Sequence, residues 1–427
     1  MLLTTALAAP ALAADDPLRK ALDAQYADLD ALYLDLHRTP ELSGQEVKTA
    51  AKMAERLKRL GFAVTTGVGG HGVVGLFKNG NGPTIMLRAD MDGLPILEKT
   101  GLEYASRAVG KGVDGLDVPV MHACGHDVHM TAFIGAATLL VGAKDRWRGT
   151  LMMVAQPAEE TGSGAMAMLQ DGLFTRFPKP DFAFGIHDHS GLPAGVVAYT
   201  SGFALASVDS VDVTVFGRGG HGAYPHTTVD PIVLAARAVV GLQTLVSREN
   251  NPLEPAVITV GSIHGGSKHN IIPEEVKLQV TVRSYKEQVR KKLLAGIERT
   301  FRGEAIAANA PREPEVKVSE STPATYNDPT LSARVAAALR GRMGSTAVIE
   351  VPPVMGAEDF SEYGRAGVPA AIFWVGTVEI GKHQESRKSG KPLPSLHSPF
   401  FAPEREPTLR GAVETLTVTA LELLGRP

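Results

Sequence analysis

Apolar and polar residues alternate with two different periods along the first two hundred residues. Helical spacing of apolar positions predicts helices over residues 17–36, 46–60 and 127–141. Short apolar and β-branched runs between these helices predict strands over residues 62–66, 73–77, 84–87, 151–155 and 182–186. Strands that alternate with helices at this spacing favour an α/β sheet with helices on its faces.

The pattern changes between residues 207 and 321. It predicts a strand at 208–216, a helix at 231–247, strands at 256–262 and 275–284, a helix at 286–307 and a strand at 315–319. This βαββαβ order is that of a ferredoxin-like sandwich, which can close on itself. Strand and helix alternation resumes after Pro323, through residues 331–342, 347–351, 370–375 and 404–424. We therefore predict one α/β domain of residues 15–206 and 322–427, interrupted by an α+β domain of residues 207–321.

Residues 1–14 predict a leader that is removed on export. An apolar run over residues 2–13 ends in the triplet Ala11, Leu12 and Ala13. A run of this length before an A-x-A site is typical of a secretory signal. The basic n-region of such a signal is missing, and a start codon assigned too late would produce the same truncation. A frayed apolar terminus is the alternative. We expect a periplasmic or secreted protein, and no other apolar run reaches the ~18 residues of a membrane span.

Charge and cysteine content exclude several classes of protein. The 427 residues contain 43 Lys and Arg against 46 Asp and Glu, which gives a net charge of −3. Such a chain has no general attraction for nucleic acid or for an anionic membrane, and we expect neither as a partner. Its one cysteine, Cys124, excludes an intramolecular disulfide and a four-cysteine zinc module.

The segment of residues 121–129 is the richest in possible metal ligands. Cys124 and His126 are two residues apart, so in an extended loop their side chains can converge on one ion, and Gly125 permits the tight backbone. Thiolate sulfur and imidazole nitrogen suit Zn²⁺ and neighbouring metals. The alternative is a loop that is polar by chance.

Two adjacent acids, Glu159 and Glu160, directly follow the predicted strand 151–155. At a strand end they can point in different directions, one toward a metal ion and the other toward the water on it. A metallohydrolase needs this division because the water requires a base to take its proton. The alternative is a solvated first turn of a helix, where acids are favoured by the helix dipole.

Two further histidines complete the possible ligand set. His187 follows the predicted strand 182–186, and ligands collect beyond the carboxyl ends of strands in α/β sheets, so Glu160 and His187 can meet there. His397 lies far along the chain in a proline-rich loop. Taken alone, His397 would be an ordinary surface histidine.

A glycine-rich stretch of the predicted inserted domain, residues 217–226, contains His221. Glycines on both sides of this histidine let the backbone pass close to a ligand, and its imidazole can donate a hydrogen bond to a developing oxyanion. The Lys and Ser/Thr pair of a phosphate-binding loop is absent, so we reject a nucleotide site.

Eight ordered motifs make the chain similar to the aminoacylase and hippurate-hydrolase branch of metallopeptidase family 20, which includes plant auxin-conjugate hydrolases. The resemblance extends from about residue 30 to residue 425. The motifs are LHRTPEL at 36–42, LRADMDGLP at 87–95, MHACGHD at 121–127, QPAEE at 156–160, HGAYPH at 221–226, NIIP at 270–273, MGAEDF at 355–360 and LHSP at 396–399. Departures are small: Asp188 and His189 follow His187 where less charge is expected, and Ile271 replaces a more usual valine.

The resemblance implies a zinc-peptidase-like α/β catalytic domain with an inserted ferredoxin-like lid and dimerisation domain. It implies a binuclear metal site, in which Glu159 is the general base and Asp90 lies near the metal ions without being a ligand. Arg88 stands where related peptidases carry a metal-binding histidine. The ligands that the resemblance implies are Cys124, His126, Glu160, His187 and His397.

The resemblance also assigns residues of the inserted domain. His221 would reach the active site of the other subunit of a homodimer. Asn270 and Arg283 match positions that hold the carbonyl or carboxylate of the substrate, and His226 and Gly356 lie in matched motifs and are further candidates for the substrate site.

The expected activity is hydrolysis of N-acyl or N-aroyl amino acids, hippurate-like or auxin-conjugate-like, to a carboxylic acid and an amino acid. Metal-bound hydroxide would be the nucleophile, and the two ions would be Zn²⁺ or Mn²⁺, with Co²⁺ or Ni²⁺ also compatible with the ligands. The alternatives are a dipeptidase or carboxypeptidase and, further off, a catalytically dead binding homologue. We expect a homodimer formed through the inserted domain, or a higher oligomer.

Overall fold

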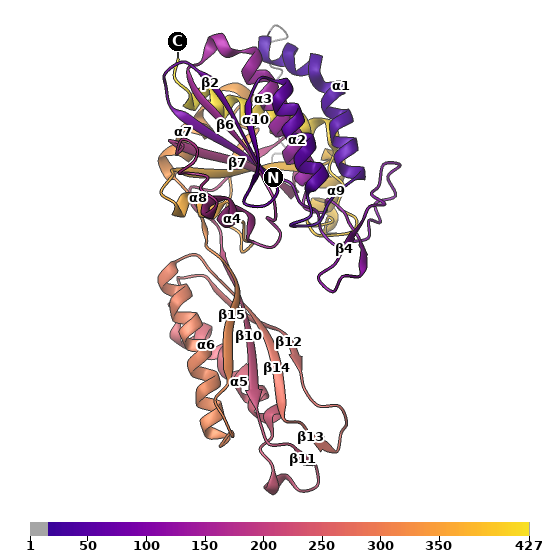
Figure 1. The fold of residues 1–427 in the computed structure, drawn as a ribbon, viewed down its shortest axis with the longest axis vertical. Coiled ribbons are helices and arrows are strands. Elements are labelled where there is room, and N and C mark those ends of the chain that lie inside the picture. The colour runs from indigo at the N-terminus through magenta and orange to yellow at the C-terminus, as the bar shows by residue number, and fades with distance from the viewer. Residues whose placement is uncertain (1–15, 427) are drawn as a thin grey trace, which may run out of the picture. The chain divides into compact units, whose positions relative to one another are not determined.

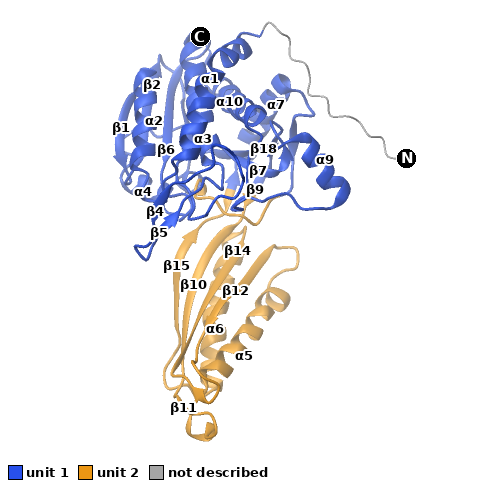
Figure 2. Cartoon of the chain, turned by 90° about the vertical axis from the view of Figure 1, so that its right-hand side faces the viewer, with its two compact units in different colours: residues 1–202, 326–352, 362–427 blue, residues 203–325, 353–361 orange. Residues whose placement is uncertain are grey.

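The computed structural model describes residues 16–426, which divide into two compact units (Figure 2). Unit 1 contains residues 16–202, 326–352 and 362–426, and unit 2 contains residues 203–325 and 353–361. The predicted leader, residues 1–14, lies outside the described residues and stays a prediction.

Unit 2 includes a segment that the sequence pattern assigned to the α/β domain. Residues 353–361 belong to it because Val354 N donates to Ala204 O at 3.0 Å and Ala206 N donates to Gly356 O at 2.8 Å. The segment has no apolar period of its own, so the sequence carried no signal for this contact.

The main sheet of unit 1 orders its strands β1–β2–β6–β3–β7–β18–β8–β17. The strands are β1 Ala63–Val68, β2 Gly72–Asn79, β3 Thr84–Asp90, β6 Gly149–Gln156, β7 Phe182–Pro193, β8 Val197–Tyr199, β17 Val348–Glu350 and β18 Ala370–Val378. β6, β3, β7 and β18 run parallel to one another. Their carboxyl ends therefore meet at one edge of the sheet, which is where α/β proteins collect ligands.

Helices cover this sheet (Figure 1). They are α1 Pro17–Arg38, α2 Val47–Arg59, α3 His126–Gly142, α4 Gly164–Gln170, α7 Pro329–Met343, α8 Ser361–Arg365, α9 Ile380–Ser389 and α10 Arg405–Leu423. α3 is buried along most of its length and contacts α1, α10 and β3. A helix that is apolar on every face must be surrounded by other elements, and α3 accordingly fills the centre of the core.

Unit 2 is a four-stranded antiparallel sheet with the order β12–β14–β10–β15. Its elements are β10 Ser207–Phe216, α5 Pro231–Thr244, β12 Ala256–His264, β14 Glu275–Ser284, α6 Glu287–Ala307 and β15 Glu315–Thr322. Buried residues alternate along β14 because one face of the sheet packs against the two helices. The chain order and strand order confirm the predicted ferredoxin-like α+β fold.

Several short elements were not predicted. They include the strand β8, the hairpin β4 Val109–Lys111 and β5 Asp117–Pro119, the two-stranded pairs β9 Gly202–Leu205 with β16 Thr325–Asn327 and β11 Gly220–His221 with β13 Ile271–Ile272, and the short helices α4, α8 and α9. Strands of two to four residues hold too few positions to show a period. β7 extends beyond its predicted end. The prediction stopped too early because the second half of the strand is polar and includes His187 and Asp188.

One described helix, Pro231–Glu249, is long and apolar enough by length and composition to cross a membrane. The sequence analysis expected no such segment. The helix packs on the sheet of unit 2 through Leu234, Ala238 and Leu242, which accounts for much of its apolar composition.

Candidate metal centre

The turn that leads into α3 presents two of the predicted ligands. Gly125 precedes the helix with φ of 82°, a left-handed conformation that glycine adopts without strain. A Cβ atom at this position would lie 2.1 Å from Asp188 Oδ2, so only glycine fits. The turn places Cys124 ahead of the helix and His126 at its first residue, and both side chains are buried.

His187 of β7 meets these two residues at the carboxyl edge of the sheet. Its Nδ1 lies 2.9 Å from the backbone oxygen of Asp188 and donates to it, so Nε2 is left as the ligand atom. Nε2 lies 3.5 Å from Cys124 Sγ. Cys124, His126 and His187 form a group whose ligand atoms all lie within 4.8 Å of one another.

A second group shares the thiol. Cys124, Glu160 and His397 also bring their ligand atoms within 4.8 Å of one another, and His397 Nε2 lies 3.4 Å from Glu160 Oε2. His397 has a left-handed φ of 63°, and its backbone N–H donates to Ala123 O at 2.9 Å, which holds it beside Cys124. The structure therefore brings all five predicted ligands together, with Cys124 common to two groups.

The residues present fit a metal centre. His126 is fully buried, and neither its Nε2 nor Glu160 Oε1 has a hydrogen-bond partner among the described residues. Buried polar atoms are normally paired, so atoms left without partners around one point indicate a missing ligand. Burial acts to lower the pKa of His126, but the carboxylates of Asp90, Asp92 and Glu160 raise it well above its usual value. The cluster thus favours positive charge, and its sulfur, nitrogen and oxygen donors suit Zn²⁺ and related ions.

A competing group of Asp90, His126 and His129 has the same compactness. Both ring nitrogens of His129 are already used, because Nδ1 lies 2.6 Å from Asp90 Oδ1 and Nε2 accepts from the backbone N–H of Asp188 at 2.9 Å. Asp90 Oδ2 also accepts from Arg88 at 2.6 Å. His129 therefore supports the ligand-bearing end of β7, and Asp90 lies near the ligands while its oxygens are held by other residues.

Glu159 is placed to act beside the ligand set. It forms a compact group with His126 and Glu160, and its Oε2 lies 3.8 Å from His126 Nε2. Glu159 is 8% exposed, so its carboxylate is largely shielded from water. Burial and the nearby charges of Asp92 and Asp90 raise the pKa of Glu160 to about 8 against the lowering effect of His126.

The remaining candidates belong to unit 2. His221 on β11 pairs with Ile271 on β13, next to Asn270, whose backbone oxygen accepts from Gly222 N at 2.8 Å. His221 Nδ1 accepts from Ala223 N at 3.0 Å, which leaves the proton on Nε2. The five candidates His221, His226, Asn270, Arg283 and Gly356 are placed here within unit 2 only.

Arg283 and His226 lie in different parts of unit 2. Arg283 is half-buried on β14 and donates to Met355 O at 3.2 Å, beside Gly356. His226 is exposed in the short helix Pro225–Thr227, with its ring centroid 6.3 Å from that of Tyr224.

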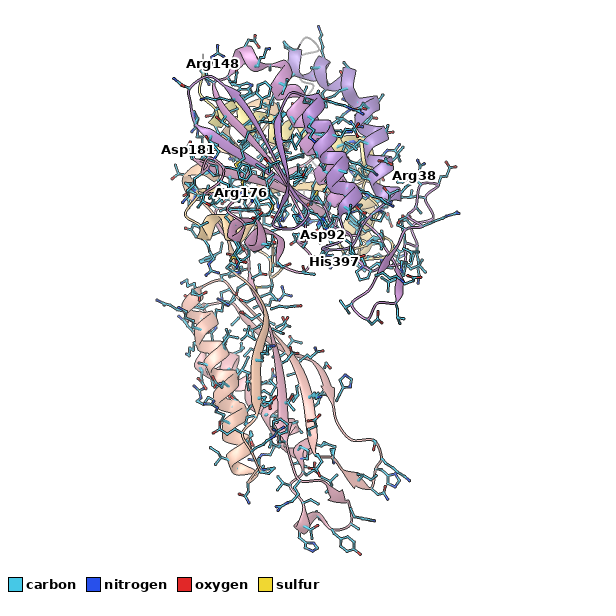
Figure 3. The ribbon with its side chains drawn as sticks, viewed as in Figure 1. Arg38, Asp92, Arg148, Arg176, Asp181 and His397 are labelled. Atoms are coloured by element: carbon cyan, nitrogen blue, oxygen red, sulfur yellow. The ribbon has the colours of Figure 1, made fainter. Side chains whose placement is uncertain are left out.

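The sequence analysis missed Asp92, His129 and Glu46, which contact the ligand-bearing segments. Asp92 and His397 are labelled in Figure 3, and both contact Glu160: Asp92 Oδ2 accepts from its backbone N–H at 3.0 Å. Asp92 follows Asp90 by two residues at the end of a strand, which was an available signal. Nothing local to Glu46 indicates its role.

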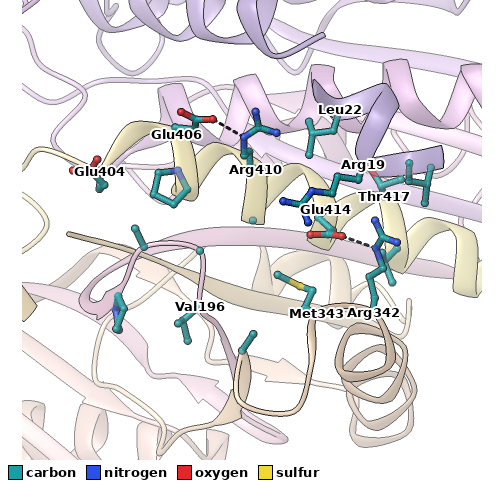
Figure 4. A pocket seen from close by; sticks show the side chains of 18 of the residues that line it. Arg19, Leu22, Val196, Arg342, Met343, Glu404, Glu406, Arg410, Glu414 and Thr417 are labelled. Atoms are coloured by element: carbon teal, nitrogen blue, oxygen red, sulfur yellow. Dashed lines mark hydrogen bonds and ion pairs between the residues drawn. The ribbon is translucent and has the colours of Figure 1, made fainter. Parts of the chain in front are cut away.

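A cavity of about 790 Å³ lies elsewhere in unit 1 (Figure 4). Two of its arginines are paired with acids, Arg342 with Glu414 and Arg410 with Glu406. No predicted site residue lines it. We assign the chemistry to the Cys124 cluster.

Known proteins similar to this chain are hydrolases. A model of peptidase family M20/M25/M40 matches residues 86–389. Thermostable carboxypeptidase 1 of Saccharolobus solfataricus is 37% identical over 374 residues, which are 86% of this chain and 89% of that protein. N-acetyl-L-cysteine deacetylase of Bacillus subtilis is 38% identical over 348 residues, 80% of this chain and 78% of the relative. IAA-amino acid hydrolase ILR1-like 4 of Arabidopsis thaliana is 34% identical over 373 residues, 87% and 80% of the two chains.

The similarity extends to solved structures. A dinuclear metal-binding peptidase of the M20 family from Bacillus subtilis superposes with a TM-score of 0.75 at 28% identity. The superposition covers 93% of this chain and 98% of the other. Both units are therefore shared with that protein, and the name of the relative agrees with a site for two metal ions.

Replacing Cys124 with serine is expected to lower the metal content of the purified protein, because Cys124 is common to both ligand groups. In cobalt-loaded protein the absorption from thiolate-to-metal charge transfer should also disappear, since Cys124 is the only cysteine. Met121→Leu, a volume-conserving change beside the same turn, is the control. An unchanged metal content and absorption in Cys124→Ser would remove Cys124 from the ligand set.

A buried ion pair beneath the centre predicts a dependence of stability on pH. His37 Nδ1 lies 2.6 Å from Asp127 Oδ2, and Nε2 lies 3.3 Å from Glu98 Oε1. Burial alone would lower the pKa of His37, but hydrogen bonds to Asp127 and Glu98 and their charges raise it from 6.5 to about 9. The stabilisation is fully present below pH 6.5 and is lost as the pH rises through about 9.

We therefore expect the difference in unfolding free energy between the parent and His37→Gln to shrink by about 3 kcal/mol from about pH 6 to about pH 9.5. Urea unfolding of metal-free protein at both values measures it. His264→Gln, on an exposed residue of β12, is the matched control. A difference that stays constant with pH would show that His37 carries no charge in the folded protein.

Proposed function

Because the chain belongs to peptidase family M20/M25/M40 and is a hydrolase of amide C–N bonds, we propose that it hydrolyses N-acyl or N-aroyl amino acids. The products are a carboxylic acid and a free amino acid. Two relatives support this substrate class through their names, an N-acetyl-L-cysteine deacetylase and an IAA-amino acid hydrolase.

The proposal depends mainly on one observation. Cys124 is common to two ligand groups, and Glu159 lies beside the same cluster with its Oε2 3.8 Å from His126 Nε2. A carboxylate that lies next to a metal centre and is not needed to complete either ligand group can act as the base that moves a proton. We assign Cys124, His126, Glu160, His187 and His397 as ligands of two divalent ions, Zn²⁺ or Mn²⁺, with Co²⁺ or Ni²⁺ also acceptable to this donor set.

When bound, the metal ions supply Lewis acidity, which polarises the amide carbonyl and acidifies water. Glu159 takes a proton from the attacking water while the oxygen of that water bonds to the carbonyl carbon. Glu159 then delivers this proton to the amine nitrogen as the C–N bond breaks. Proton transfer by a positioned carboxylate typically contributes about 10²–10⁴-fold to the rate.

His221 is assigned as a donor to the developing oxyanion. Its Nδ1 accepts from Ala223 N, so Nε2 carries the proton that an oxyanion would accept. The neighbouring Asn270 has a buried Oδ1 atom without a hydrogen-bond partner in the part of the chain that the structure describes, and Arg283 adds a cation on β14. These groups suit the polar end of an N-acyl amino acid.

We further propose that two copies of the chain associate through unit 2. Its α5 exposes Ile232, Val233 and Val240, and the edge strand β12 exposes Ile263. Apolar residues grouped on one surface beside an unpaired strand edge favour association with a second copy. His221 would then act across the dimer.

A carboxypeptidase activity is the second candidate. It is favoured by the 37% identity to thermostable carboxypeptidase 1, and it would require the same metal ions and recognition of the same carboxylate. The two candidates differ in the group on the acyl side of the scissile bond. This group is an amino acid residue in a peptide and an acyl or aroyl group in the proposed substrates.

A substrate panel tests the proposed function. Protein reconstituted with Mn²⁺, Zn²⁺ or Co²⁺ should hydrolyse N-acetyl, N-benzoyl or N-indolylacetyl amino acids with higher kcat/KM than dipeptides. Glu159→Gln should retain metal and lose about 10²–10⁴-fold in kcat, while Glu385→Gln on α9 should match the parent. Faster cleavage of peptides would establish the carboxypeptidase candidate, and no cleavage of either class would reject an enzymatic role for the site.

Mixed dimers test the assignment of His221. His221→Ala should keep its metal and lose about 10²–10³-fold in kcat, as expected for loss of one oxyanion donor. Mixing it with Glu159→Gln should restore part of the parent activity, because one site of the mixed dimer would have both residues intact. Confirmed mixed dimers without restored activity would place His221 at the site of its own subunit.

A further inference from the structure

The loop that carries Glu159 and Glu160 has an unfavourable backbone conformation. It connects β6 to α4 over residues 157–163, and Ala158 has a left-handed φ of 53°. This conformation costs a non-glycine residue about 1–2 kcal/mol. Hydrogen bonds to Ala158 must therefore offset this cost; its backbone oxygen accepts from Ser163 N and Gly164 N, and its N–H is bonded from outside the loop.

Glu46 holds one side of this loop. It is fully buried, and its Oε1 accepts from the backbone N–H of Ala158 at 2.8 Å and from that of Gly44 at 2.9 Å. Ala158 is thus fixed by a side chain that lies 112 residues earlier in the sequence. Its other oxygen, Oε2, has no hydrogen-bond partner among the described residues.

Asp92 holds the other side. Its Oδ2 accepts from the backbone N–H of Glu160 at 3.0 Å and from Ser43 Oγ at 2.6 Å, and it is 1% exposed. Its Oδ1 lies 3.3 Å from His126 Nδ1. Asp92 therefore connects the loop to the start of α3 as well as to the turn at residues 43–44.

Capping of α2 does not explain Glu46. Although Glu46 immediately precedes α2, its side chain makes no capping hydrogen bond to the helix. Glu41 has that role, since its carboxylate accepts from the backbone N–H groups of Lys48 and Thr49 and from the Thr49 hydroxyl. The Oε1 of Glu46 is directed instead to the loop and to the turn before it.

We propose that Glu46 and Asp92 are positioning residues that hold the backbone on both sides of Glu159 and so fix the direction of its carboxylate. The two hydrogen bonds flank Glu159, one residue before it and one residue after it. This inference rests on the proposed role of Glu159 as the base. Neither residue needs to contact the substrate.

Amide hydrogen exchange tests, without any substrate, whether Glu46 holds the loop of residues 157–163. In Glu46→Ala, exchange in the peptide that covers residues 157–163 should rise by about 10- to 100-fold, because the N–H of Ala158 loses its acceptor. Glu46→Gln should keep the parent rate, since its amide oxygen can accept both bonds. Glu41→Ala is the matched control: it should lower the thermal midpoint and leave this peptide protected.

Steady-state kinetics supply the second measurement. Glu46→Ala should lower kcat by about 10- to 100-fold with KM and metal content close to those of the parent, and Glu46→Gln should recover most of the loss. Glu46→Asp, one methylene shorter, should lie between them and serves if the alanine variant does not fold. Unchanged exchange at residues 157–163, or an equal loss of kcat in Glu41→Ala, would overturn the proposal. If exchange rises while no substrate of the panel is cleaved even by the parent, the proposal that Glu46 holds the loop is supported and the proposed function fails.

Discussion

Asp90, Asp92 and Glu46 are each 1% exposed or less, and they lie where the parallel strands of unit 1 end. An ionised carboxylate removed from water costs several kcal/mol unless charges or hydrogen bonds replace the lost hydration. Asp90 receives Arg88 and His129, Asp92 receives Ser43 and the backbone of Glu160, and Glu46 receives two backbone N–H groups. The need to compensate these charges ties together the segments that carry the ligands.

The same requirement explains why the cluster suits cations. Arg88 is fully buried and permanently charged, and a guanidinium has no lone pair to offer a metal. The sequence motifs predict that Arg88 stands where related peptidases carry a metal-binding histidine. Here the arginine neutralises Asp90, and the thiol and imidazole of Cys124 and His126 stand at the start of α3. Burial and the nearby Asp127 raise the pKa of Asp188 well above its usual value.

Gly125, Ala158 and His397 adopt left-handed backbone conformations at the site. Only the first is glycine, so the other two store strain that neighbouring hydrogen bonds must offset. His397 is held through Ala123 O, and Ala158 through Glu46. Glu159, Glu160 and His397, which are the predicted base and two of the predicted ligands, therefore lie in loops whose geometry depends on contacts from distant parts of the chain.

The sequence by itself determined the repeating elements and the chemistry of the ligands. Strand β14 has its predicted bounds, and α6 begins one residue later than predicted, because burial on one face imposes a period that the sequence displays. The motifs that contain Cys124 and Glu160 predict the donors, since few residue types can hold a metal ion.

Only the tertiary structure decided which polar residues serve the site. It excluded His129 as a ligand by filling both ring nitrogens, and it brought Glu46 to Ala158 across 112 residues. It also joined residues 353–361 to unit 2. A periodic pattern reports only which face of its own helix or strand is buried, whereas these contacts depend on the path of the chain between elements, which leaves no local trace in the sequence.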